Sequence, residues 1–238
     1  MGQVPEKLVK PPLLIVGNGR VARHFRYYFE NNSIPIVQWS RSSIESLTEV
    51  LNKNQPKTAL ILIQDSAIVP WIERHPEVQS MNLIHFSGCL STPLAVGMHP
   101  LMTFGPTLYE LSHYQNIPFI CEEGRLQFSD VFQGLQNPIY SIQAEDKPFY
   151  HALCVLSGNF SVILWQKLFR EFESRLNIPS SAAQPYLEQM TRNLLSQPDL
   201  ALTGPLQRKD QLTIEKNLNA LQGDAFQAIY QAFREIYS

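Results

Sequence analysis

Residues 13–22 read Leu-Leu-Ile-Val-Gly-Asn-Gly-Arg-Val-Ala, an apolar run that ends in a glycine-rich turn. A short continuous apolar run is typical of a strand buried on both faces of a parallel sheet. The turn follows the pattern Gly17-x-Gly19-x-x-Ala22, and a helix is expected over residues 20–30. This order predicts a site for the pyrophosphate of a dinucleotide, because the helix offers free N–H groups and its positive dipole end to the anion.

Each position of the turn has its own role in this prediction. Gly17 makes the tight turn, Gly19 leaves room for the phosphates, and Ala22 lets the helix pack closely on the strand. The other expected cofactor-binding positions of this segment are Asn18, Arg20 and Val21. The alternative is an ordinary tight turn between a strand and a helix, which the motif alone does not exclude.

The second predicted strand, residues 34–39, leads into Ser40-Arg41-Ser42 and indicates which dinucleotide binds. Enzymes that use NAD usually carry Asp or Glu about 20 residues after the glycines, where it holds the ribose hydroxyls. This chain has no acid there, and Arg41 stands 22 positions after Gly19. A guanidinium flanked by Ser40 and Ser42 suits a 2′-phosphate, so the sequence predicts NADPH as the cofactor. In the alternative interpretation, Arg41 is a solvated loop residue.

The composition is that of a globular protein. Of the 238 residues, 44% are hydrophobic and 17% are charged, and the net charge of −2 gives no reason to expect nucleic acid or an anionic membrane as a partner. The three cysteines are scattered without metal-ligand spacing, which predicts no metal site and a reducing compartment. No apolar run approaches the ~18 residues of a membrane span, and the N-terminus has no signal-peptide pattern, so we expect a cytoplasmic protein.

Strand-like and helix-like segments alternate in the first part of the chain, which predicts an α/β fold with two domains. Residues 1–145 form the expected dinucleotide-binding domain, a Rossmann-type doubly wound parallel sheet. Residues 146–238 form an expected all-helical domain for substrate binding and dimerisation. Strands are predicted at 13–16, 34–39, 58–63, 82–86, 94–98, 117–121 and 139–142. Further helices are predicted at 44–52, 68–74, 146–176, 182–196, 210–221 and 225–237.

Polar residues follow the predicted strands at their carboxyl ends, where open parallel sheets bind ligands. Gln64 and Asp65 follow the third strand and are expected to contact the cofactor, although Asp65 could instead cap the next helix. Ser87 and Gly88 follow the fourth strand. A hydroxyl and a glycine N–H at this position can bind a substrate carboxylate or carbonyl, and an ordinary turn is the alternative.

His99 is the leading catalytic candidate. It ends a predicted strand, and Pro100 restricts its backbone to an extended conformation. Reduction of a ketone by hydride needs a proton for the developing alkoxide, which histidine can donate near neutral pH. A histidine that only holds the loop is the alternative.

Three polar residues on the otherwise apolar helix 146–176 are further catalytic candidates: Lys147, His151 and Asn159. His151 and Asn159 lie about 80° apart around the helix and about 12 Å apart along it, so both could border one cleft. Polar packing between helices is the alternative, because buried polar groups need partners. Arg208, on the polar loop before the helix 210–221, could hold a substrate carboxylate through two hydrogen bonds or form an ion pair with Asp210.

The first half of the helix 146–176 is apolar on nearly every side. Such a helix is expected to be buried among other helices or at a subunit contact. In a domain of about 90 residues it is too apolar to lie at the surface, so we expect a homodimer built through the C-terminal helices.

The segments Val-Gly-Asn-Gly-Arg-Val-Ala, His85–Gly88, Gly97–Phe104 and Leu202–Asp210 together resemble a largely uncharacterised family of Rossmann-like oxidoreductases with a C-terminal helical domain of unknown function. That family is similar to the wider 6-phosphogluconate dehydrogenase-like group, which includes ketopantoate reductase and prephenate dehydrogenase. The resemblance extends over nearly the whole chain. One departure is Lys209, where the family pattern has glycine.

The resemblance implies a function and site roles. The His-Pro segment is similar to the loop whose histidine contacts the substrate hydroxyl in prephenate dehydrogenases, which implies a catalytic or substrate-binding role for His99. A helical-domain asparagine or lysine near the substrate is usual in the wider group, which implicates Asn159 and Lys147. We expect an NADPH-dependent reductase of a small 2-oxo acid, with ketopantoate as the leading specific substrate. The alternatives are a prephenate or arogenate dehydrogenase and a regulatory protein that binds NADPH without turnover.

Overall fold

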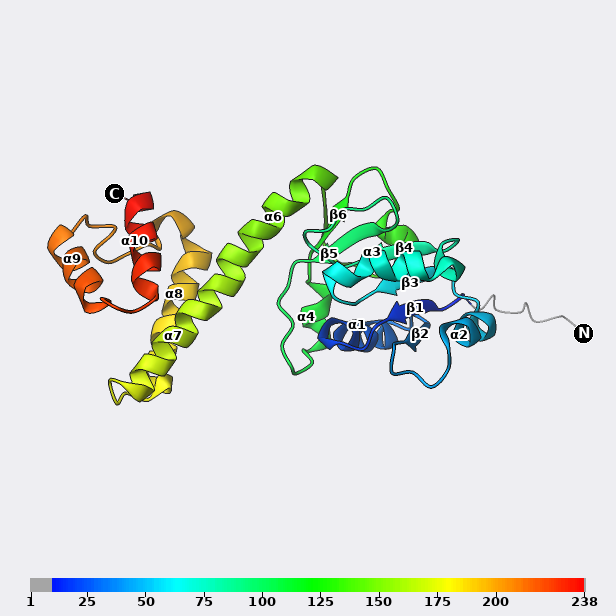
Figure 1. The fold of residues 1–238 in the computed structure, drawn as a ribbon, viewed down its shortest axis with the longest axis horizontal. Coiled ribbons are helices and arrows are strands. Elements are labelled where there is room, and N and C mark those ends of the chain that lie inside the picture. Colours follow the sequence, from blue (N-terminus) through cyan, green and yellow to red (C-terminus); the bar gives the residue numbers. More distant parts are fainter. Residues whose placement is uncertain (1–9, 238) are drawn as a thin grey trace, which may run out of the picture. The chain divides into compact units, whose positions relative to one another are not determined.

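The structure is a computed structural model and describes residues 10–237 (Figure 1). The chain forms two compact units that divide between Ser161 and Val162. The sequence-based boundary lay between residues 145 and 146, before helix α6 (Lys147–Cys154), which is part of the first unit. Lys147 is ion-paired with Glu122 of the sheet, which ties the start of α6 to this unit. The segment 1–9, for which no signal peptide was predicted, lies outside the described residues.

The first unit is built on a seven-stranded sheet, as the sequence predicted, with the strand order β2-β1-β3-β4-β5-β6-β7. The strands are β1 (Leu13–Val16), β2 (Ile36–Trp39), β3 (Thr58–Ile61), β4 (Asn82–His85), β5 (Val96–Pro100), β6 (Phe119–Glu122) and β7 (Ile139–Ile142). Neighbouring strands are parallel except for β5 and β6, which pair antiparallel, so the sheet is mostly rather than wholly parallel. The chain passes from β1 outward to β2 and then back across to β3, so the switch point lies between β1 and β3.

Helices cover both faces of this sheet, and Figure 1 shows α1 and α3 on opposite sides. One face packs against α1 (Arg20–Asn31), α4 (Leu111–Gln115) and α5 (Phe128–Val131). The other packs against α2 (Leu47–Asn54) and α3 (Asp65–Arg74). The residues of β1 alternate between these two cores, with Leu13 and Ile15 in the first and Leu14 and Val16 in the second. The continuous apolar run is therefore explained by burial on both sides.

Helix α2 begins later than the sequence predicted. Its N-cap is Ser46, which forms a reciprocal capping box with Glu49. The adjoining short helices α4 and α5 and the 3₁₀ turn Pro76–Val78 were not predicted, since segments of three to five residues carry too little periodicity to be recognised.

A continuous helix runs from Ala144 to Ser174 and crosses from the first unit into the second. It consists of a 3₁₀ turn (Ala144–Asp146), α6, a π-helical segment (Val155–Phe160) and α7 (Ser161–Ser174). By length and composition alone it could span a membrane, and none of its most apolar window is buried in the single chain. Burial among helices of the same chain, one of the two arrangements expected for it, is therefore not observed.

The second unit is all-helical. Its elements after α7 are the 3₁₀ turns Ser180–Ala183 and Pro198–Leu200 and the helices α8 (Gln184–Ser196), α9 (Gln211–Ala220) and α10 (Phe226–Tyr237). Asp210 caps α9 by accepting a hydrogen bond from the backbone N–H of Thr213. Lys209, just before it, has a φ of 54°, a left-handed conformation that favours glycine. The backbone there keeps the conformation suited to the glycine of the family pattern although the residue is lysine.

Candidate active site

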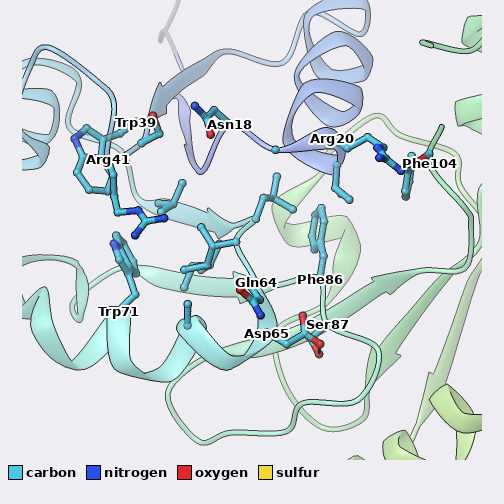
Figure 2. A pocket seen from close by; sticks show the side chains of 18 of the residues that line it. Asn18, Arg20, Trp39, Arg41, Gln64, Asp65, Trp71, Phe86, Ser87 and Phe104 are labelled. Carbon is cyan, nitrogen blue, oxygen red and sulfur yellow. Dashed lines mark hydrogen bonds between the residues drawn. The ribbon is translucent and has the colours of Figure 1, made fainter. Parts of the chain in front are cut away.

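A cavity of about 1080 Å³ opens in the first unit at the carboxyl ends of β1 to β5. It lies at the switch point of the sheet, where doubly wound folds bind their ligands. Its volume reaches the upper end of the ~300–1000 Å³ range of small-molecule sites, which fits a ligand as large as a dinucleotide. Figure 2 shows its walls, which come from the turn after β1, the loop after β2, helix α3 and the segment after β4.

The glycine turn forms one wall of this cavity. Gly17 has a φ of 118°, and a Cβ added there would collide with the carbonyl oxygen of Leu62. Gly19 is the N-cap of α1, and a Cβ built on it would meet nothing within 4 Å. The open space beside Gly19 therefore lies next to the unpaired N–H groups of the first turn of α1. No acidic residue lies in that turn, so an anion there would meet no negative side chain of the turn.

The other residues predicted around this turn have different surroundings. Asn18, Arg20 and Val21 line the cavity, whereas Ala22 is fully buried against the sheet. The Nη1 of Arg20 donates to the carbonyl oxygen of Phe104 at 3.2 Å. Arg20 thereby connects the start of α1 to the loop that follows β5 (Figure 2).

The far end of the cavity is basic and aromatic. Ser40, Arg41 and Ser42 line it, as do Trp71 and Arg74 of α3, which sequence reasoning missed. Figure 2 shows Arg41 and Trp71 facing each other from the loop after β2 and from α3. Within the described residues, the guanidinium of Arg41 has no hydrogen-bond or ion-pair partner. Their spacing was the signal that could have found them: Trp71 and Arg74 stand three residues apart, which places them on the same face of a helix.

Gln64 and Asp65 line the cavity at the end of β3, and Asp65 fixes Ser87. The Ser87 hydroxyl donates to Oδ2 of Asp65 at 2.5 Å and accepts from the backbone N–H groups of Cys89 and Leu90. Its proton and lone pairs are therefore engaged by the protein. Although Ser87 lines the cavity, the role predicted for its hydroxyl, donation to a substrate carboxylate, does not fit this geometry.

Gly88 provides space for two histidines. A Cβ there would lie 2.5 Å from Nδ1 of His151 and 3.1 Å from Nε2 of His99. Close packing around the two imidazole rings therefore requires glycine at position 88. The predicted contact between its backbone and the substrate stays a prediction.

His99 is the one of the four predicted catalytic residues that lines the cavity. It lies within β5, and its Nδ1 is 2.7 Å from the hydroxyl oxygen of Tyr150 on α6. Burial, followed by the nearby His151 and Lys147, lowers the pKa of His99 to about 4. His99 is therefore neutral at pH 7. Its role as proton donor stays a prediction from the sequence.

Lys147, His151 and Asn159 lie on the helix, outside the cavity lining. The Lys147 ammonium is buried and pairs with Oε1 of Glu122 at 2.7 Å, so it serves the packing of α6 on the sheet. Its Nζ occupies the place where a Cβ of residue 97 would lie, which explains glycine at that position. Nδ1 of His151 is buried without a hydrogen-bond partner among the described residues. Asn159 is exposed within the π-helical segment.

The remaining predicted residue, Arg208, lies in the second unit on the turn that precedes α9. The sequence also marked no metal site, and among residues 10–237 no group of three or more His, Cys, Asp or Glu side chains could hold a metal ion.

Comparisons with known proteins agree with this architecture. Residues 121–236 match the family described as a domain of unknown function, DUF2520. A Bacteroides fragilis protein provisionally named an NADP oxidoreductase is 19% identical, with a TM-score of 0.77 and coverage of 95% of this chain and 97% of that one. The chain has the fold of that protein.

Two enzymes with informative names share the fold at lower similarity. The imine reductase of Streptomyces aurantiacus is 12% identical, with a TM-score of 0.63 and coverage of 94% of this chain and 93% of that one. A reductive aminase of Aspergillus terreus in complex with NADPH and ethyl levulinate is 14% identical, with a TM-score of 0.57 and coverage of 95% and 88%. None of these three structures is named as a ketopantoate reductase. Comparison with curated proteins gives no match.

Proposed function

We propose that this protein is an NADPH-dependent reductase that acts on the carbonyl or imine carbon of a small molecule. One observation carries the proposal: a single cavity joins the glycine turn, the basic loop after β2 and His99. A phosphate-binding turn, a group for the 2′-phosphate and a hydrogen-bonding residue for the substrate are the three parts that such a reaction requires.

The cavity has the features that NADPH needs. The open space beside Gly19 fits the pyrophosphate, which the first turn of α1 would hold through its N–H groups. Arg41, free of partners among the described residues, would bind the 2′-phosphate, with Arg74 across the cavity as a second cation. When bound, NADPH supplies the hydride.

His99 would bind the substrate. As a neutral imidazole, it would hold the carbonyl oxygen or imine nitrogen by a hydrogen bond and strengthen that bond as negative charge develops. Phe86, Met102 and Phe104 would exclude water from this end of the cavity.

The substrate class follows from what surrounds His99. Because the Ser87 hydroxyl is engaged by Asp65, the proposal includes no serine ligand for a substrate carboxylate. Ketopantoate and other 2-oxo acids need a ligand for their carboxylate. The remaining candidate is Arg208, whose role as that ligand is a prediction from the sequence. Imines and ketones need no carboxylate ligand, and the names of the imine reductase and reductive aminase that share the fold favour including them.

One experiment tests the activity. Purified protein is mixed with NADPH and panels of 2-oxo acids, ketones, and ketone–amine pairs, and loss of NADPH absorbance is followed. Turnover with one panel supports the proposal and identifies the class. Binding of NADPH without turnover on any panel would favour the regulatory alternative, and oxidation of prephenate or arogenate with NADP⁺ would favour the dehydrogenase alternative.

The proposal includes a homodimer in the cytoplasm, as the sequence predicts. On the helix 144–174, several large apolar side chains are exposed in the single chain: Phe149, Leu153, Leu156, Phe160 and Val162. A second copy of the same helix is the occupant we propose for this face, since burying each other's apolar faces removes the exposure from both. Light scattering at micromolar concentration should give twice the chain mass. A monomer that partitions into detergent micelles or vesicles would instead indicate a membrane surface.

A further inference from the structure

We propose that Tyr150 is a positioning residue for His99: its hydroxyl donates to Nδ1 of His99 and so presents Nε2–H of the neutral ring to the cavity. The tautomer follows from the hydrogen bond alone, whereas its value for catalysis rests on the proposed function.

The contact joins two elements that lie far apart in the chain. Tyr150 is on α6 and His99 is on β5, and the hydroxyl oxygen lies 2.7 Å from Nδ1. The two rings meet edge to face, with centroids 5.6 Å apart and an interplanar angle of 75°. On the other side of the imidazole, Nε2 has no hydrogen-bond partner among the described residues, while His99 lines the cavity.

The direction of the hydrogen bond follows from the alternatives open to Tyr150. Its other polar neighbour is Cys154, one turn further along the same helix. A thiol is a weak donor and its sulfur a weak acceptor, whereas an imidazole nitrogen is a good acceptor. The phenol proton therefore goes to Nδ1 of His99. Since a neutral imidazole carries one N–H, that proton resides on Nε2.

Burial and the neighbouring positive charges keep the ring of His99 neutral. Burial is the main cause of its lowered pKa, and His151 and Lys147 act in the same direction. His151 lies with its ring centroid 5.8 Å from that of His99, and Lys147 is itself paired with Glu122. A neutral ring can donate to substrate only from the nitrogen that carries the proton. If Nδ1 carried it, Nε2 would present a lone pair to the substrate oxygen and repel it.

The first test is spectroscopic and requires no substrate. Protein with ¹⁵N-labelled histidine is studied by NMR at neutral pH, and the His99 signals are assigned by their loss in His99→Gln. We expect Nδ1 of His99 to be unprotonated and Nε2 protonated. In Tyr150→Phe, we expect both nitrogens to shift toward a mixture of tautomers. Tyr140→Phe is the matched control, because Tyr140 is 59% exposed on β7.

Two results would overturn the inference. One is a wild-type His99 that carries its proton on Nδ1, which would make Tyr150 the acceptor. The other is a Tyr150→Phe spectrum identical to that of the wild type. Thermal unfolding of both tyrosine variants shows whether each is folded, so a lost signal is not mistaken for a tautomer change.

The second test measures turnover with any substrate that the screen identifies. Tyr150→Phe should lower kcat about tenfold, a part of the ~10²- to 10³-fold that a positioned hydrogen-bond donor contributes. The dissociation constant of NADPH should stay unchanged, because the tyrosine contacts the histidine and not the cofactor site. An unchanged kcat in Tyr150→Phe would show that Tyr150 does not contribute to turnover. If no substrate is turned over, the proposed function fails, while the NMR result still decides the tautomer.

Discussion

The two ends of the candidate site differ in how their polar groups are engaged. At the glycine turn and the loop after β2, Arg41 is unpaired among the described residues and the space beside Gly19 is open. At α6, the buried Lys147 ammonium is held by Glu122 and lies outside the cavity lining. Partnerless groups beside a cavity are available for a ligand, and paired buried groups stabilise the fold. Whether a polar side chain has a partner within the protein therefore distinguishes binding residues from structural ones, which residue type alone does not.

The largest expected effect is on turnover at His99. His99→Ala should lower kcat by about 10²- to 10³-fold, because it removes the hydrogen-bond donor from the reacting atoms. The dissociation constant of NADPH, measured by fluorescence titration, should change little. His151→Ala is the companion variant. If it lowered kcat while His99→Ala left kcat unchanged, the catalytic role would belong to α6 and not to the residue that lines the cavity.

The next effect is on stability at Lys147. Lys147→Met should lower the free energy of unfolding by about 3 kcal/mol, because it leaves the buried Glu122 carboxylate with only the longer ion pair to Arg125, at 3.4 Å. Chemical denaturation measures this change. Lys53→Met is the control: Lys53 pairs with Glu45 at the surface, where both side chains are at least half exposed, and should cost under ~1 kcal/mol. Equal effects of the two variants would mean that Lys147 is not structural.

A smaller effect is expected on cofactor choice at Arg41. Arg41→Ala should weaken NADPH binding by about 10- to 150-fold, the value of a ~1.5–3 kcal/mol charged hydrogen bond, and leave NADH binding nearly unchanged. Arg74→Ala tests the second cation in the same way. Equal affinity of the wild-type protein for NADH and NADPH would remove the 2′-phosphate from the proposal.

An effect that is small at any one pH, but accumulates as the pH falls, concerns the fully buried His85. Burial, with a contribution from Lys147, lowers its pKa to about 3. Between pH 6.5 and pH 3, the unfolded chain therefore binds a proton that the folded chain does not. The free energy of unfolding should fall with decreasing pH over this window, by about 1.4 kcal/mol per pH unit from this residue. His85→Gln should flatten that part of the curve, whereas His113→Gln, at an exposed position, should not.

Much of the first unit could be predicted from local sequence. The strand, glycine turn and helix of residues 13–31 were recognised because all three signals lie within one short segment. The basic loop at Arg41 was found in the same way, by counting from the glycines. The edge of the sheet was harder: β5 and β6 pair antiparallel, which depends on the path of the chain between them and not on the pattern of either strand.

The site residues that the sequence missed act through distant partners. Trp71 and Arg74 come to the cavity because α3 packs beside the loop after β2, and Tyr150 reaches His99 across 51 positions of the chain. Lys147 was chosen for its residue type, but its partner Glu122 stands 25 positions earlier in the chain. A single sequence does not state such pairings, so the burial that turns a candidate catalytic lysine into a structural one was not foreseeable.

The packing of Gly97 under the buried pair has an evolutionary consequence. A Cβ at position 97 would collide with Nζ of Lys147 and would lie 2.6 Å from Oε1 of Glu122. A larger residue at 97 is thus tolerated only after the lysine has been shortened. A shortened lysine leaves Glu122 with only the longer ion pair to Arg125, so an uncharged residue at 122 favours that step. Among related sequences, positions 97, 122 and 147 should therefore change together and in a restricted order.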